Sequence, residues 1–155
     1  MGLFGPSEFV RFVEACEKPR APTIRVNTLR LKRRELAQML ISRGVELEAV
    51  GFCPEALTVF KSQVPLGATP EYMRGFYMLQ DAASLLPVIV LNPQPNEKIL
   101  DMAAAPGGKT THICARMKNT GVLVCNDANV DRLQALQANL SRMGCTNVIV
   151  TNYEA

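Results

Sequence analysis

The 155-residue chain is 48% apolar and 20% charged, with a formal net charge of +3 at pH 7. This composition is ordinary for a globular protein and the length is sufficient to bury a real core, which excludes a disordered or fibrous chain. The chain has five cysteines, an odd number without short paired spacing, which argues against a disulfide framework or a zinc site. The longest apolar run, Leu85–Leu91, is too short to span a bilayer.

The first half of the chain alternates helical and extended patterns. The expected elements are a helix over 8–16, a strand over 23–27, a helix over 32–43 and a strand over 57–60. Alternation in the first strand predicts a half-buried segment with Ile24 and Val26 facing inward. Gly44 is a suitable residue to end the second helix, and the turn residues of Gly67–Gly75 predict a linker.

The second half repeats strands and helices in the order typical of a parallel sheet. A covering helix over 82–91 has to place Pro87 in its first turn or kink there. From Glu97 onward the pattern is strand, helix, strand, helix, strand, with Val148–Val150 as the third strand. The helix before that strand carries an apolar stripe of Val130, Leu133, Leu136, Leu140 and Met143. Parallel pairing through crossover helices is therefore expected.

The segment Ile99–Thr110 is the most informative part of the chain. A short buried strand is followed by small residues and a glycine pair that opens a helix, namely Ala103, Ala104, Ala105, Pro106, Gly107, Gly108 and Lys109. Without bulky side chains, a ligand can lie against the main chain at the carboxyl end of the strand, where open α/β sheets bind ligands. The glycine spacings of a Walker loop and of the dinucleotide fingerprint are missing. A nucleoside without phosphates therefore remains, with an ordinary tight turn as the alternative.

A carboxylate stands at the end of the next strand. Asp127 closes the apolar run that begins at Val122 and lies twenty residues after Gly107. A doubly wound sheet places there the acid that accepts hydrogen bonds from ribose hydroxyls. The alternative is that Asp127 caps the helix that follows.

The segment Asp101–Thr110 resembles the S-adenosylmethionine loop of the Nol/Nop/Sun family of RNA cytosine-5 methyltransferases. Further segments that resemble the family's signatures are Arg25–Leu29, Pro65–Tyr72, Tyr77–Ser84, Lys118–Gly121 and Asn126–Asn129. The last two point to the nucleolar branch that modifies large-subunit ribosomal RNA. The likeness extends from about Pro19 to Ala155. Ala103 and Ala104 stand where relatives often carry cysteines other than the catalytic ones.

The resemblance implies an α/β fold with two parts. Residues 1–74 would form an N-terminal helix, a small basic RNA-recognition-like module and a linker. Residues 75–155 would form the cofactor-binding half of a Rossmann-like methyltransferase domain. S-adenosylmethionine would be held by residues 103–109 and Asp127, with Glu154 near the adenine. The implied partners are ribosomal RNA and proteins of the pre-ribosomal particle, in the nucleolus of the nucleus.

The family's chemistry depends on two cysteines. A thiolate that follows a threonine adds to carbon 6 of cytosine, so that carbon 5 can attack the methyl group. A second cysteine, after a proline, helps to release the product. Neither Thr-Cys nor Pro-Cys occurs here, because Cys53 precedes a proline and Cys145 precedes a threonine. We therefore expect an amino-terminal fragment that binds cofactor, contains no catalytic residue and is inactive alone.

Positive charge is concentrated in the first half. Residues 1–74 contain 11 Lys and Arg against 8 acids, residues 75–155 contain 6 of each, and no acid occurs between positions 18 and 34. The cations expected to contact RNA phosphates are Arg25, Arg30, Lys32, Arg33 and Arg34. A solvated charged face is an equally weighted alternative. Because no aromatic residue lies within the run, such contacts would supply affinity rather than sequence choice.

His112 is the single histidine and lies in the first turn after the glycine loop. No partner motif accompanies it, so it is expected to be structural or exposed rather than a general base. Two other functions stay open. One is a small-molecule methyltransferase that shares the loop, which the basic module disfavours. The other is a non-catalytic RNA-binding factor in ribosome assembly.

Overall fold

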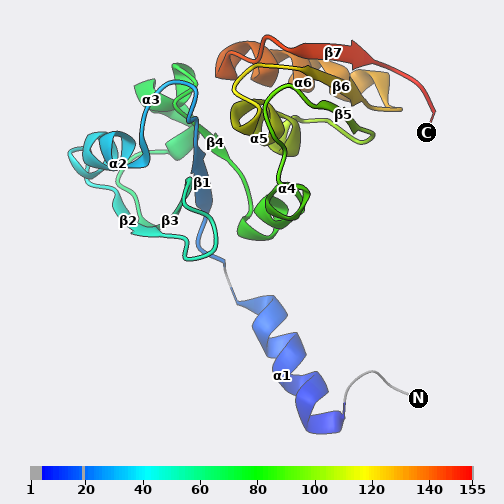
Figure 1. The fold of residues 1–155 in the computed structure, drawn as a ribbon. Coiled ribbons are helices and arrows are strands. Elements are labelled where there is room, and N and C mark those ends of the chain that lie inside the picture. The colour runs from blue at the N-terminus through cyan, green and yellow to red at the C-terminus, as the bar shows by residue number, and fades with distance from the viewer. Residues whose placement is uncertain (1–4, 19, 155) are drawn as a thin grey trace.

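A computed structural model describes residues 5–18 and 20–154. The chain forms an antiparallel sheet with strand order β2-β3-β1-β4 and a parallel sheet with strand order β5-β6-β7. The two sheets and their helices lie beside each other, and helix α1 (Pro6–Glu17) projects away from both (Figure 1). Residues 1–4 and 19 of the expected N-terminal part and residue 155 of the expected cofactor-binding half lie outside the described residues.

The first module is built on one antiparallel sheet. Its strands are β1 (Thr23–Val26), β2 (Glu46–Ala49), β3 (Ala56–Lys61) and β4 (Tyr77–Leu79). The elements between them are α2 (Arg33–Ile41), the 3-10 turn η1 (Leu66–Ala68) and the short helix α3 (Pro70–Met73). The expected helices and strands over 8–16, 23–27, 32–43 and 57–60 are confirmed, with small shifts of their ends. Strand β2 was not anticipated, although Glu46–Ala49 alternates acidic and apolar residues, because the segment is short, largely exposed and built from residues with weak strand preference.

Strand β1 differs from the expected half-buried strand, since all four of its residues are buried. It is an interior strand of the sheet. Ile24 and Val26 pack with Leu36 and Leu40 of α2, while the opposite face is turned toward the second sheet's helices. The alternating residues of β1 therefore face two different buried surroundings, the core of the first module on one side and the second module on the other.

The expected linker is also more structured than a linker. Gly67–Gly75 contains most of η1 and all of α3, and β4 follows it as an edge strand paired with β1. The first sheet consequently extends past residue 74, where the sequence placed the boundary between the two parts.

The second module follows the expected alternation. Its elements are β5 (Lys98–Asp101), α5 (Gly108–Arg116), β6 (Val122–Asn126), α6 (Val130–Met143) and β7 (Val148–Thr151). Both strand pairs are parallel, as predicted. The expected helix over 82–91 is a 3-10 turn, η2 (Ala82–Leu85), that continues into α4 (Leu86–Leu91), with Pro87 in the first turn of α4.

The two faces of the parallel sheet have different surroundings. Leu123 and Cys125 of β6 are buried in one cluster with Ile113 of α5 and Leu136 of α6. On the other face, large apolar side chains such as Leu100 of β5 and Ile149 of β7 are more than half exposed, at 56% and 53%. Within the described residues, no helix combines the length and apolar character needed to cross a bilayer.

Candidate cofactor-binding site

The loop after β5 is held by hydrogen bonds to the last residue of the strand. The Asp101 carboxylate accepts a hydrogen bond from the Thr110 hydroxyl at 2.7 Å and one from the Ala103 amide at 3.4 Å. Asp101 thereby joins the end of β5 to the first turn of α5. The small residues between them lie close to the backbone of the next strand, because the Ala104 amide donates to the Asn126 carbonyl at 2.9 Å.

Gly107 is the point at which the loop turns into α5. Its φ is +104°, a conformation that residues with a side chain rarely adopt. A Cβ at this position would also lie 3.1 Å from Cδ1 of Leu136, which is tighter than ordinary packing. The preceding Ala105–Pro106 peptide bond is cis. The backbone conformation and the close approach of α6 thus both favour a glycine at this position.

A cavity of about 210 Å³ opens beside the loop. Six of the seven predicted loop residues line this side, namely Ala103, Ala104, Ala105, Pro106, Gly108 and Lys109. The opposite side is formed by the segment from β4 into η2, with Gln80, Asp81 and Ser84. These three residues belong to a segment that resembled a family signature, yet sequence reasoning gave them no role. Only the tertiary fold brings them to the loop.

Asp127 lies directly behind the loop and is almost completely buried. Its Oδ2 accepts a hydrogen bond from the Ala105 amide at 3.0 Å, and its Oδ1 accepts one from the Asn129 amide at 3.1 Å. Nη1 of Arg132 lies 3.5 Å from Oδ2 and forms an ion pair with the carboxylate. The N-cap of α6 is Asn129, whose side chain accepts from the Asp131 amide. The helix-cap alternative for Asp127 is therefore wrong. Oδ1 has one N–H partner and keeps a second lone pair that can accept a further hydrogen bond, whereas Oδ2 faces both the Ala105 amide and the Arg132 guanidinium.

Glu154 is not brought to the loop cavity. It is exposed beyond β7 and lines a different hollow, of about 310 Å³, together with Met102, Asn126 and Tyr153. Lys109 is exposed and borders the loop cavity. The structure thus gathers the alanine-glycine loop and Asp127 and leaves Glu154 apart.

Arg25 corrects the prediction of a basic RNA surface. Its side chain is completely buried, and its guanidinium donates to groups of the second module rather than to solvent. A phosphate cannot reach it in this arrangement. Burial lowers the pKa of Arg25 to about 10, so the guanidinium stays charged at neutral pH.

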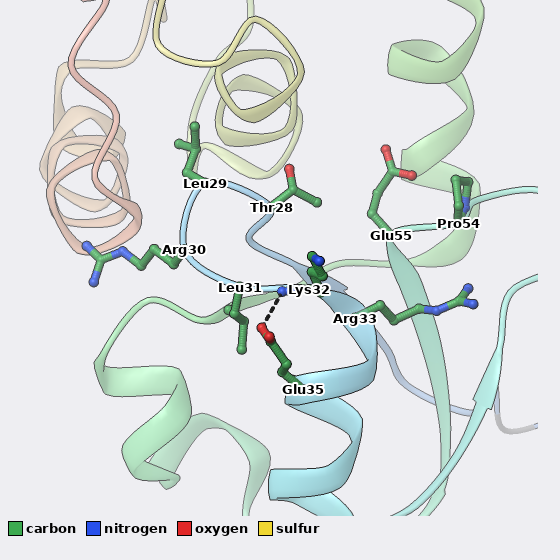
Figure 2. Close-up of a pocket in the computed structure, with 9 residues that line it drawn as sticks. All are labelled: Thr28, Leu29, Arg30, Leu31, Lys32, Arg33, Glu35, Pro54 and Glu55. Atoms are coloured by element: carbon green, nitrogen blue, oxygen red, sulfur yellow. Dashed lines mark hydrogen bonds between the residues drawn. The ribbon is translucent and has the colours of Figure 1, made fainter.

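The remaining predicted cations lie around the start of α2. Lys32, Arg33 and Glu35 line a cavity of about 520 Å³ together with Pro54 and Glu55 (Figure 2). Arg30 points away from Arg33, and its guanidinium donates to the carbonyls of Arg74 and Arg142. Lys32 and Arg34 are exposed and Arg33 is partly exposed. In the described part of the chain none of these three side chains forms an ion pair, so they remain available to an anion.

His112 lies in a buried charge cluster between the modules. Its Nε2 is 2.9 Å from Oε1 of Glu55, and the same oxygen accepts hydrogen bonds from Arg116. These donors lower the pKa of Glu55 to about 2. Burial lowers the pKa of His112 to about 4, which favours a neutral ring that donates from Nε2. These surroundings fit the expected structural role of His112.

Cys53 adjoins this cluster, and one ligand atom from each of Cys53, Glu55 and His112 lies within 4.8 Å of the others. Burial raises the pKa of the Cys53 thiol to about 11, so its sulfur keeps its proton at neutral pH. The Glu55 carboxylate is already neutralised by the Arg116 guanidinium. The negative charge of Glu55, just before β3, is therefore balanced by the positive charge of Arg116 in α5.

Two family models match the chain. The N-terminal domain of the 16S rRNA methyltransferase RsmF matches residues 2–82, and the 16S rRNA methyltransferase RsmB/F model matches residues 88–155. The first match ends in η2, after β4, in agreement with the extent of the first sheet.

Curated relatives and solved structures are similar over almost the whole chain. The "25S rRNA (cytosine-C(5))-methyltransferase nop2" of Schizosaccharomyces pombe is 58% identical over 98% of this chain and 25% of its own length. The "28S rRNA (cytosine(4447)-C(5))-methyltransferase" of Homo sapiens is 54% identical over 99% of this chain and 19% of its own length. A methyltransferase homologue from Pyrococcus horikoshii superposes with a TM-score of 0.89 at 37% identity, covering 93% of this chain and 47% of its own. The chain thus spans about a quarter or less of these two curated relatives.

Proposed function

The chain belongs to the RsmB/F family of rRNA (cytosine-C5) methyltransferases, and from this premise we propose that it forms the cofactor-binding part of an enzyme that methylates carbon 5 of cytosine in ribosomal RNA. The observation that carries the proposal is the loop of small residues at the carboxyl end of β5, open to a cavity and backed by Asp127. S-adenosylmethionine would supply the methyl group on a sulfonium.

The residues fit that cofactor by size and by charge. Alanines and glycines leave room for a ligand against the main chain. The Asp127 carboxylate lies next to Ala105 and keeps a lone pair on Oδ1, which suits a hydroxyl of a ribose. The backbone from Ala103 to Lys109 would surround the methionine portion. Gln80 and Ser84 would close the opposite side.

Ribosomal RNA is the proposed substrate, and the first module is its proposed docking surface. Lys32, Arg33 and Arg34 cluster at the start of α2 without ion-pair partners among the described residues, as a phosphate-contacting surface requires. We place the protein in large-subunit ribosome biogenesis in the nucleolus, where proteins of the pre-ribosomal particle are its proposed neighbours. The proposal rests on the names of the eukaryotic relatives and on the segments Lys118–Gly121 and Asn126–Asn129.

Calorimetric titration with S-adenosylmethionine tests the cofactor assignment. Replacing Asp127 by asparagine keeps the size of the side chain but removes its charge. We expect affinity to fall roughly tenfold or more, which corresponds to about 1.4 kcal/mol, because a charge-assisted hydrogen bond to the ribose is lost.

The matched control is Asp131→Asn, since Asp131 is an exposed acid in the first turn of α6, the helix that follows Asp127. It should bind S-adenosylmethionine as the unaltered chain does. Equal affinity in the Asp127 and Asp131 variants would remove Asp127 from the site.

A further inference from the structure

Arg25 is a buried arginine that extends from the first module into the second. It lies in the interior strand β1, and its side chain is 0% exposed. Nη1 donates to the Gly108 carbonyl at 2.5 Å and to Oε1 of Gln80 at 2.6 Å, and Nη2 donates to the Thr111 hydroxyl at 2.7 Å. Gly108 and Thr111 both belong to the first turn of α5.

The Thr111 hydroxyl links Arg25 to the last residue of the loop, Gly107. It donates to the Gly107 carbonyl at 2.7 Å while it accepts from Arg25. Arg25 therefore fixes two successive carbonyl groups, Gly108 directly and Gly107 through one hydroxyl. Because a peptide unit is planar, fixing these carbonyls also sets the direction of the Gly108 and Lys109 N–H groups. The first N–H groups of a helix have no partner inside the helix and are suited to bind an anion.

Burying this guanidinium is costly, and no carboxylate offsets the cost. Within the described residues Arg25 forms no salt bridge, and its hydrogen-bond acceptors are an amide, a carbonyl and a hydroxyl. The nearby Glu55 carboxylate is bound to His112 and Arg116. The Arg25 Nε has no hydrogen-bond partner among the described atoms. An apolar side chain would fill this space without the desolvation penalty, so stability alone does not account for an arginine here.

We propose that Arg25 is a positioning residue for the S-adenosylmethionine loop, through which the first module completes the cofactor site of the second. The proposal rests on the proposed function. In it, the Gly108 and Lys109 N–H groups held by Arg25 receive the carboxylate of the methionine portion, while Asp127 holds the ribose. Arg25 therefore affects one end of the cofactor and not the other.

The test compares two ligands in an Arg25→Lys variant. S-adenosylmethionine carries the methionine carboxylate, and 5′-methylthioadenosine lacks it. A lysine keeps the charge but cannot bridge Gly108 and Thr111 with a planar fork. Calorimetry should show S-adenosylmethionine bound at least tenfold more weakly and 5′-methylthioadenosine bound within twofold of the unaltered chain. A merely structural role would weaken both ligands alike, and that result would overturn the proposal.

The matched control is Asn27→Ala. Asn27 is two residues from Arg25, so it lies on the same face of the extended chain. Its Nδ2 donates to the Gly75 carbonyl in the first module and also crosses to the Met143 carbonyl in the second. Among the described residues its side chain has no hydrogen bond to the loop, so the ratio of the two affinities should not change. A shift in that ratio for Asn27→Ala as large as for Arg25→Lys would also contradict the proposal.

A second variant and a ligand-free measurement cover the other outcomes. If Arg25→Lys does not fold, Thr111→Val removes the hydroxyl acceptor while it keeps the charge and the shape, and it should give the same selective loss. Amide hydrogen exchange without ligand should speed up about tenfold over residues 104–109 in either variant and not in Asn27→Ala. If the unaltered chain binds neither ligand, the proposed function fails while the exchange rates still decide whether Arg25 orders the loop. Unchanged exchange there would overturn the positioning role.

Discussion

At the scale of single residues, His112 shows how its surroundings determine a protonation state. Nε2 faces Glu55 at 2.9 Å, and Nδ1 is buried without a hydrogen-bond partner among the described residues. Protonating the ring would place an N–H at Nδ1 with no acceptor, besides moving a charge out of water. The pKa of His112 is accordingly lowered from 6.5 to about 4.

This lowered pKa predicts an acid-sensitive fold. A group whose pKa is lower in the folded state contributes stability above its unfolded pKa, and that contribution is lost as the pH falls toward the folded value. The free energy of unfolding should therefore decrease between pH 6.5 and about 4, with a slope approaching ~1.4 kcal/mol per pH unit. Urea denaturation at a series of pH values measures the slope.

The chain has one histidine, so a His112→Gln variant isolates its contribution. Between pH 6.5 and 5 the variant should lose most of the pH dependence, because carboxyl groups, Glu55 included, are largely ionised in this range and titrate below it. A variant that keeps the full slope would show that His112 is not the group that makes the fold acid-sensitive.

At the scale of elements, the two modules meet where backbone approaches backbone. Gly75, between α3 and β4, has φ +69°, and a Cβ there would lie 1.9 Å from the carbonyl oxygen of Arg142 at the end of α6. The Gly75 carbonyl accepts from Asn27, and the Arg142 guanidinium donates to the carbonyls of Tyr72 and Tyr77. The end of α6 is thus joined to the start of β4 with no room for a side chain.

We expect Gly75→Ala to lower the free energy of unfolding by about 3 kcal/mol or more, because positive φ and a backbone clash both oppose the methyl group. The matched control is Gly51→Ala, since a Cβ at Gly51 meets no heavy atom within 4 Å. That change should stay within about 0.5 kcal/mol. Thermal unfolding of the two variants compares them directly, and equal melting temperatures would mean that α6 and β4 do not meet as described.

At the scale of the whole molecule, charge divides into paired and unpaired cations. Arg20, Arg43 and Lys61 each form an ion pair, with Asp81, Glu71 and Glu46 respectively. Lys32, Arg33 and Arg34 form none in the described part of the chain, and they gather at the start of α2. When RNA binds, its phosphates should therefore exchange their counterions mainly for the unpaired cations Lys32, Arg33 and Arg34.

Two triple variants with the same change in net charge test this division. Replacing Lys32, Arg33 and Arg34 by glutamine should weaken binding to many RNA sequences alike and flatten the logarithmic salt dependence by about 2, as for three lost contacts to single-stranded RNA. Replacing Arg20, Arg43 and Lys61 by glutamine should change the slope far less. Salt titrations in a filter-binding assay give both slopes, and equal slopes would favour a solvated charged face.

The sequence by itself determined the parallel half of the fold and the position of the loop. Periodicity and small residues are local signals, so the alternation of β5, α5, β6, α6 and β7 and the glycine turn could be read directly. The resemblance to RNA cytosine-5 methyltransferases, which the family comparison confirmed, rested on the same contiguous segments.

Only the tertiary structure decided which side chains meet. Arg25 stands in a run of cations and looks like a surface residue, yet it is buried because β1 became an interior strand. The short β2 and β4 exist as edges of that sheet, where pairing with a neighbour outweighs weak local preference. Gln80 lines the loop cavity beside Gly108, which is 28 residues later in the chain. Glu55 and His112, which are 57 residues apart in the sequence, form a hydrogen bond. Such contacts depend on how two modules pack, and burial then reverses the role that charge alone would assign.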